Sequence, residues 1–396
     1  MDDQQIPRPN IDAGRIGALI DWLIGGALPP APLSAIVTEI CEQLGAAGVR
    51  LDMLETGVMT LHPVVPGAHI IWRRKRPILE QAHSRDILRS EMFVNSPSDL
   101  VLRNGRTVRC RLREGEPMND HPFVEHRRMR GYRDAIFFPL PQTTGERHVF
   151  AAFTKEEDGW TDAEFDALWQ IQAPFARVLE AKTLATSTET LLSTYVGRGA
   201  GGRILNGQIE PGDIDEISAV IFFANLKNFT KLSNEVPARQ VIQTLNRFFA
   251  TFEGSIREQR GEILKFVGDG ILALFPTPDD YHAQKAAVRG ALISIDTARE
   301  TLNSLDDFPG FRAALHVGDV AYGNVGGRER LDFTAIGPTV NFAARLLSHA
   351  SEIDADLVAS DAVTRYIDDR KFEKQESSFK GFMGKHGLAI IAARNS

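Results

Sequence analysis

The chain has 396 residues, enough for two domains of ordinary size and a connecting element. With 43% hydrophobic and 24% charged residues it has the composition of a folded globular protein, which excludes collagen-like, disordered and disulfide-rich chains. The formal net charge of −7 argues against extensive electrostatic binding to nucleic acid or anionic lipid.

The two cysteines, Cys41 and Cys110, lie far apart and lack the spacing of metal ligands, as in reduced proteins. The first residues, MDDQQIPRPN, lack the order of a signal peptide, and the apolar stretch 16–37 is broken by Asp, Gly and Pro. We therefore expect a cytoplasmic protein without a membrane span.

The first half of the chain has the pattern of an α/β domain that ends in a long helix. A helix is expected over 33–44, and a hairpin over 135–140 and 148–154, because the intervening PQTTGER is rich in turn formers. Further strands are expected at 58–61, 68–72 and 107–113. The exit helix should begin at Thr161, which forms a capping box with Glu164, and Pro174 should kink it.

This order of elements resembles a GAF-type small-molecule sensor over roughly residues 15–185. The resemblance implies a small-molecule ligand that the sequence does not name; the other interpretation is a structural or dimerising domain. Arg109, Arg111 and Arg113 alternate with apolar residues and should share one strand face, either solvated or anion-binding.

The glycine-rich stretch 195–213 predicts a linker, and the pattern after it is βαββαβ. Strands are expected at 217–224, 262–267, 271–275, 311–317 and 320–325, and helices from Pro237 to about Gly261 and over 282–305. A right-handed crossover would place the strand after Gly268-Asp269-Gly270 beside 217–224 and antiparallel to it. Asn225 and Asp269 should then lie side by side at one edge of the sheet, where a carboxylate pair could hold two divalent cations.

Four stretches in this half resemble the class III adenylate and guanylate cyclases: FFANLKNFT (222–230), LKFVGDGILALF (264–275), LHVGDVAYGNVG (315–326) and RLDFTAIGPTVNFAARL (330–346). The resemblance covers 215 to about 394 and implies a ferredoxin-like βαββαβ catalytic domain behind the GAF-like α/β domain. We therefore expect a sensor domain at 1–160, an exit helix and transmission linker at 161–213, and a nucleotidyl cyclase domain at 214–396 in an α/β (α+β) protein.

The resemblance also implies the activity, conversion of ATP to 3′,5′-cyclic AMP and pyrophosphate with Mg²⁺ or Mn²⁺. It further implies a homodimer whose active sites are shared between chains, with Asn225 and Asp269 from one chain and the other site residues from its partner. Asp269 falls on the second metal-binding Asp of the family, and Asn225 falls where the first should stand.

Two further pairs match the substrate-binding residues of the family. Lys265 and Asp332 match the pair that reads adenine, in which an ammonium donates to a ring nitrogen and a carboxylate accepts from the exocyclic amine. Asn341 and Arg345, four residues apart on one helix face, match the Asn that orients the ribose and the Arg that stabilises charge on the transferring phosphate.

The segment Asn228, Phe229 and Thr230 matches the phosphate-binding segment. Asn228 replaces the usual Gly, and Asn is the least costly substitute if the backbone there has positive φ.

Asn225 is the main departure from the family pattern. An amide oxygen can ligate a divalent cation, but it brings no negative charge and cannot accept a proton. Asn225 is either natural, as in a pseudocyclase that binds nucleotide and signals by conformation, or a deliberate Asp-to-Asn change in an enzyme. Because Asp269, Lys265, Asp332, Asn341 and Arg345 are all present, we favour a cyclase scaffold with an altered metal site.

Overall fold

The computed structural model describes every residue except 1–9, 60–66, 117, 119 and 393–396. The N-terminal residues MDDQQIPRP and part of the strand expected at 58–61 lie outside the described residues. The chain forms two compact units, an N-terminal unit (Met1–Leu191) and a C-terminal unit (Leu192–Ser396). Within the described part of the chain, no helix is long and apolar enough to span a bilayer.

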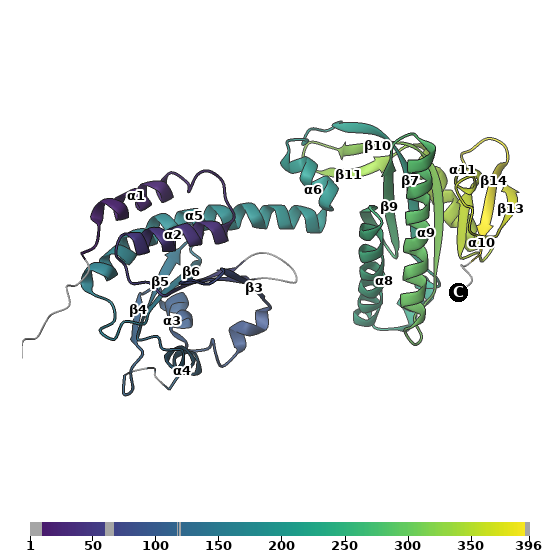
Figure 1. Ribbon diagram of the computed structural model, residues 1–396. Helices are drawn as coiled ribbons and strands as arrows, with labels where there is room; N and C mark the ends of the chain where they lie inside the picture. Colours follow the sequence, from purple (N-terminus) through teal and green to yellow (C-terminus); the bar gives the residue numbers. More distant parts are fainter. Residues whose placement is uncertain (1–9, 60–66, 117, 119, 393–396) are drawn as a thin grey trace, which may run out of the picture. The chain divides into compact units, whose positions relative to one another are not determined.

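The N-terminal unit is built on a six-stranded antiparallel sheet of order β3-β2-β1-β6-β5-β4 (Figure 1). Its strands are β1 (Met53–Met59), β2 (Gly67–Arg73), β3 (Leu79–His83), β4 (Val108–Arg111), β5 (Asp134–Pro141) and β6 (Arg147–Thr154). The predicted β5–β6 hairpin is confirmed. The strand expected at 58–61 instead begins at Met53.

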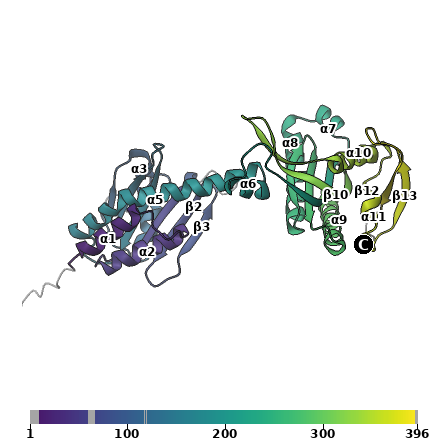
Figure 2. The ribbon, with the colours of Figure 1, turned by 90° about the horizontal axis from the view of Figure 1, so that it is seen from above.

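Helices cover both faces of this sheet. The helices α1 (Ala13–Ile24), α2 (Leu33–Ala46) and α5 (Asp162–Tyr195) share one core with the sheet, and Figure 2 looks onto this layer. The short η1 (Arg85–Arg89), α3 (Pro97–Asn104) and α4 (Pro122–Met129) lie on the other side (Figure 1). The mixed α/β architecture is thus confirmed, whereas the likeness to a GAF sensor stays a prediction.

The exit helix begins where its cap predicts. Thr161 N donates to Glu164 Oε2 over 2.9 Å, and Glu164 N donates to Thr161 Oγ1 over 3.3 Å, which completes the capping box. The carboxylate also accepts bonds from Arg50 Nε (2.8 Å) and Nη2 (2.7 Å). Helix α5 continues through Pro174 to Tyr195.

The expectation of a solvated or anion-binding arginine face is wrong for Arg109 and Arg111 of β4, whereas Arg113, beyond the strand, is exposed. Asp134, completely buried on the neighbouring strand, accepts from Arg109 Nη2 over 2.8 Å and pairs with Arg111 over 3.3 Å. Arg111 and Arg113 also donate to the carbonyls of Asp158 and Glu157. The arginines therefore neutralise a buried carboxylate and hold the loop before α5.

The C-terminal unit is an eight-stranded sheet of order β13-β14-β12-β10-β7-β9-β8, with β11 paired to β10. Its strands are β7 (Ile214–Leu226), β8 (Glu262–Val267), β9 (Gly270–Thr277), β10 (Phe311–Gly326), β11 (Leu331–Ile336), β12 (Leu357–Ser360), β13 (Phe372–Ser377) and β14 (His386–Ile391). Its helices are α6 (Arg198–Leu205), α7 (Phe229–Glu235), α8 (Ala238–Glu258), α9 (Tyr281–Asn303), α10 (Pro338–Glu352) and α11 (Asp361–Thr364).

The two faces of this sheet are covered differently. Alternate β7 residues such as Phe222 and Ala224 pack against α8 and α9, which lie side by side in Figure 1. The intervening residues, such as Ala219 and Ile221, join a second core with α6, β11 and α10. Because side chains alternate along a strand, Asn225 is on the same face of β7 as Ala219 and Ile221.

Two expectations for this unit need correction. The glycine-rich stretch expected as a linker contains α6, because Ala200 packs into the second core and Glu262 binds the first turn of the helix. The two strands expected within 311–325 are one strand, β10. Gly318 lies within this continuous strand and pairs with Ala219 of β7. A Cβ on Gly318 would lie only 2.9 Å from Thr339 Oγ1, so glycine at this position allows α10 to approach the strand.

Candidate functional site

The strand order brings Asn225 and Asp269 together. Strands β7 and β9 are antiparallel neighbours, and Asn225 at the end of β7 lies opposite Gly270 at the start of β9. Leu226 N donates to Asp269 O over 3.3 Å, so the two backbones are joined directly. The predicted side-by-side placement is therefore confirmed, while the metal-binding role of these residues stays a prediction.

The polar atoms at this edge include oxygen ligands suited to a hard cation, but they supply too little negative charge for two cations. Burial raises the pKa of the Asp269 carboxyl. Asn225 Oδ1 is buried and has no hydrogen-bond partner among the described residues. An orphaned amide oxygen beside a carboxylate matches the oxygen ligands that Mg²⁺ and Mn²⁺ prefer. The residues fit a divalent cation in kind but supply a single negative charge, and no cluster of three His, Cys, Asp or Glu suited to a metal occurs in the described part of the chain.

Lys265 of β8 and Asp332 of β11 form an ion pair. Lys265 follows a register shift in the pairing of β8 with β9, and Asp332 lies on β11 opposite Val325. Lys265 Nζ is bonded to Asp332 Oδ2, and the two side chains are 30% and 60% exposed. An ammonium and a carboxylate thus lie together and are both partly accessible to solvent.

Helix α10 presents Asn341 and Arg345 to solvent. Its opposite side is buried through Val340, Ala343 and Leu346, and Thr339 Oγ1 donates to Asp319 O over 2.7 Å, which fixes the start of the helix on β10. Asn341 and Arg345 are exposed, and their side chains make no hydrogen bond or ion pair within the described residues. Both polar groups are available to a ligand.

The segment from Asn228 to Thr230 begins α7. Asn228 has φ 55° and ψ 28°, the left-handed conformation that Asn tolerates better than most residues. The positive φ that would make Asn the least costly substitute for Gly is therefore present, while the match of Asn228 to a family glycine stays a prediction, and Phe229 and Thr230 form the first turn that follows.

The six main site residues form three separate groups on one chain. Asn225 neighbours Asp269, Lys265 bonds Asp332, and Asn341 shares a helix face with Arg345. In the part of the chain that the structure describes, no hydrogen bond or ion pair connects one group with another.

The sequence interpretation missed Glu262, which connects α6 to β8. Its Oε1 accepts from Ala200 N over 3.2 Å, and its Oε2 accepts from Tyr322 Oη over 2.8 Å. Arg203 of α6 pairs with Asp215 and lies over the Tyr322 ring, 4.8 Å from its centroid. The glycines that leave room for Glu262 were the available signal, but they were attributed to a linker.

The adenylate and guanylate cyclase catalytic domain family matches residues 210–389. The match covers less than half of the chain, and over that stretch the chain is similar to an adenylate and guanylate cyclase catalytic domain. Among curated relatives, the uncharacterized protein Rv1320c of Mycobacterium tuberculosis is 32% identical over 231 residues, which are 56% of this chain and 39% of that protein. Adenylate cyclase 1 of Rhizobium meliloti is 32% identical over 161 residues, 39% of this chain and 24% of that protein. The matched part of the chain thus spans well under half the length of these relatives.

Solved cyclases also match the chain. The adenylyl cyclase CyaB from P. aeruginosa is 24% identical, with 45% of this chain and 95% of that chain covered and a TM-score of 0.40. The guanylyl cyclase Cya2 is 22% identical, with 46% and 95% covered and a TM-score of 0.41.

Proposed function

We propose that the chain is an adenylyl cyclase that converts ATP to 3′,5′-cyclic AMP and pyrophosphate, with a metal site weakened by Asn225. The observation that carries the choice of ATP is the Lys265–Asp332 pair inside the cyclase domain. The ring nitrogen at position 1 of adenine accepts a hydrogen bond and its amine donates one, which complements an ammonium beside a carboxylate. Guanine has these two groups interchanged, so in the same orientation its carbonyl would face the carboxylate and its N–H would face the ammonium.

The other residues have complementary roles in this proposal. Arg345 donates to the phosphate oxygens on which charge develops, because its guanidinium keeps its charge and bonds two oxygens at once. Asn341 orients the ribose from the same helix face. Asn228, Phe229 and Thr230 offer backbone N–H groups to the phosphates at the start of α7. Asn225 cannot take the proton of the ribose 3′-hydroxyl, so this proton must leave to another acceptor.

A divalent cation, Mg²⁺ or Mn²⁺, would be held by the Asp269 carboxylate and the Asn225 amide oxygen. When bound, it supplies Lewis-acid stabilisation of the hydroxyl and phosphate oxygens. With one carboxylate instead of two, this chain should hold the cation weakly.

We further propose that a homodimer shares its active sites between chains, with Asn225 and Asp269 from one chain and the other two groups from its partner. The support is that each group is presented separately on one chain. Complementation tests this in the Asn225→Asp background. One variant also carries Asp269→Asn and the other also carries Arg345→Ala, so each alone should be inactive. Random pairing makes half of the dimers mixed, each with one intact site, so the mixture should recover about a quarter of the parent activity. No recovery in demonstrably mixed dimers would contradict shared sites.

The base preference is tested by a matched pair of variants. Asp332→Asn removes the acceptor for the adenine amine, so it should raise the KM for ATP and reduce the preference for ATP over GTP. Glu329→Gln removes the same charge from a nearby exposed position and should change neither. If both variants behave alike in the active Asn225→Asp background, the adenine-reading role is wrong.

A second function, a nucleotide-binding signalling protein without turnover, is favoured by Asn225 itself. Incubating the chain and its Asn225→Asp variant with ATP and Mn²⁺ or Mg²⁺ separates the two proposals. Cyclic AMP from the variant supports the cyclase, whereas tight ATP binding by both proteins without product from either supports the signalling protein.

We also propose that the N-terminal unit regulates this activity through α5 and α6. The support is that α6 is bonded to β8 through Glu262, three residues from Lys265. A displacement of α6 would therefore act on β8, the strand that carries Lys265 of the proposed adenine-binding pair Lys265–Asp332. Loosening α6 should change the KM for ATP more than the turnover number.

A further inference from the structure

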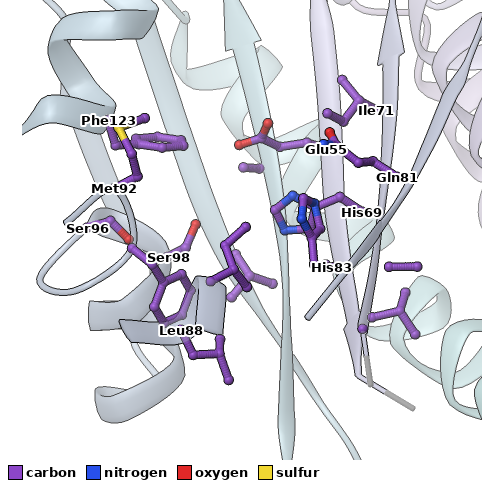
Figure 3. Close-up of a pocket in the computed structure, with 18 of the residues that line it drawn as sticks. Glu55, His69, Ile71, Gln81, His83, Leu88, Met92, Ser96, Ser98 and Phe123 are labelled. Atoms are coloured by element: carbon purple, nitrogen blue, oxygen red, sulfur yellow. The ribbon is translucent and has the colours of Figure 1, made fainter. Parts of the chain in front are cut away.

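The N-terminal unit contains a cavity that has no part in the cyclase chemistry. Its volume is about 380 Å³, and it lies between the sheet and the helices of one face (Figure 3). Glu55, His69 and Gln81 reach it from the strands, whereas Met92 and Phe123 approach from the opposite wall. Cavities of about 300–1,000 Å³ are the usual size for small organic ligands. The space is therefore sufficient for a compact organic molecule.

Most of the cavity wall is apolar. Apolar side chains line both sides, among them Val58, Ile71, Leu88, Met92, Phe93 and Phe123. Each Å² of apolar ligand surface that is buried against this wall contributes about 25 cal/mol. The body of the ligand should therefore be hydrophobic.

The charged residues of the wall have one predominant sign. Among the described residues that line the cavity, four are arginines and one, Glu55, is acidic, with no lysine or aspartate. Arg127 Nη2 donates to Glu55 Oε2 over 2.5 Å, and both residues are more than nine-tenths buried. This pair is neutral overall, so Arg73, Arg130 and Arg147 give the wall a positive excess.

Two of these arginines lie near the buried pair. Ile71 on β2 faces Glu55 in the sheet register, and Arg73, two residues further on, points from the same face. Arg130 directly follows α4, which carries His126 and Arg127. The pKa of His126 is lowered, mainly by burial and further by the charges of Arg130 and Arg127. This is the direction expected at an electropositive end of a cavity.

The polar residues of the wall also have unused bonding capacity. His83 Nε2, His126 Nδ1 and Arg127 Nε are buried and have no hydrogen-bond partner among the described residues. Buried polar atoms are nearly always paired, and an all-hydrocarbon ligand could not serve them. The ligand should therefore carry a polar group as well as its hydrophobic body.

We propose that this cavity binds an amphipathic organic acid, with its hydrophobic body along the apolar wall and its carboxylate toward Arg73, Arg127 and Arg130. The site belongs to the N-terminal unit and does not depend on whether the C-terminal unit turns over ATP. Its test therefore measures binding and not cyclic AMP formation.

The experiment is isothermal titration calorimetry on the full chain with two probes that share one body. Naphthalene-2-carboxylate carries the charge, and naphthalene-2-carboxamide is its neutral counterpart. We expect one carboxylate to bind per chain, at least about tenfold more tightly than the amide, because hydrogen bonds to a charged group are the stronger ones. Arg130→Gln should weaken the carboxylate about threefold and leave the amide unchanged, in keeping with an exposed charge.

Two controls make the result specific to the cavity. Arg128→Gln removes the same charge from α4, but Arg128 pairs with Glu114 and does not line the cavity, so both probes should bind as before. Leu88→Trp fills the cavity and should weaken both probes. Because Arg127→Gln strands the Glu55 carboxylate and could unfold the unit, the conclusion rests on Arg130→Gln and Leu88→Trp.

Four results would overturn the proposal: no binding of the carboxylate at millimolar concentration, equal affinities for the two probes, unchanged carboxylate binding in Arg130→Gln or Leu88→Trp, or tighter binding of cyclic AMP than of the carboxylate. The last would indicate a site for a polar phosphate ester instead of a hydrophobic acid.

Discussion

The attachment of α6 to β8 gives a prediction whose size follows from the structure. Gly199 lies in the first turn of α6, and an alanine Cβ there would lie 2.6 Å from Cδ of Glu262 and closer still to both carboxylate oxygens. Atoms cannot approach this closely, so either the Glu262 side chain or the helix must move. The side chain is held at both oxygens, by Ala200 N over 3.2 Å and by Tyr322 Oη over 2.8 Å.

The cost of Gly199→Ala is the difference of two terms. Leaving a buried donor such as the Tyr322 hydroxyl without its acceptor costs about 1–3 kcal/mol. Alanine offsets about 0.5–1 kcal/mol of this through its better helix propensity. The net local loss therefore lies between about 0 and 2.5 kcal/mol, and we expect a value near the middle, about 1.3 kcal/mol. Gly202, in the same helix, has no atom within 4 Å of its hypothetical Cβ, so Gly202→Ala should stabilise the helix by about 0.5–1 kcal/mol.

Amide hydrogen exchange of peptides covering 198–205 and 262–267 measures these effects locally, where a two-unit chain need not unfold in one step. Gly199→Ala should speed exchange about tenfold in both peptides, since about 1.4 kcal/mol is a factor of ten. Gly202→Ala should slow exchange in 198–205. If Gly199→Ala slows exchange as Gly202→Ala does, the Glu262 contact does not hold α6.

Three further predictions concern single residues. Asn228→Gly should change the free energy of unfolding by less than about 1 kcal/mol, whereas Asn228→Val, at φ 55°, should cost about 1–2 kcal/mol in urea titrations. Burial raises the pKa of Glu164, but hydrogen bonds from Arg50 and Thr161 lower it by more, so its contribution to stability is present above the unfolded pKa and is lost as pH falls through the lower folded value. Glu164→Gln should therefore flatten the loss of stability that sets in as pH falls below the unfolded pKa of a glutamate, about 4.3, and an unchanged pH profile would contradict this. Arg345→Ala in an active background should lower kcat about 100-fold while the KM for ATP changes little; an equal loss of affinity would count against a transition-state role.

Local chemistry made several elements predictable. The Thr161–Glu164 box fixed the start of α5, and the turn formers of PQTTGER indicated the β5–β6 hairpin, because both depend on residues close in sequence. The place of Asn225 beside Asp269 also followed, since the crossover rule constrains strand order.

The misreadings have a shared physical cause, partners that are distant in sequence. The local pattern predicts a solvated or anion-binding face for Arg109 because its partner, the buried Asp134, is 25 positions away. It predicts a linker in place of α6 because glycine has poor helix propensity, yet Glu262 binds this helix from 62 positions away. Tertiary contacts override local preference at such places, and a single sequence gives no record of them.

The central claim is that residues 210–389 are a working cyclase scaffold limited by the missing carboxylate at position 225. The most direct measurement is the initial rate of cyclic AMP formation from ATP and Mn²⁺ by the full chain, its Asn225→Asp variant and the Asn225→Asp, Asp269→Asn double variant. A positioned acid–base or metal-binding group contributes about 10²–10⁴-fold, so Asn225→Asp should exceed the unaltered chain by at least about 100-fold and the second substitution should abolish the gain. Absence of cyclic AMP from a folded, ATP-binding Asn225→Asp variant with either Mn²⁺ or Mg²⁺ would contradict the claim.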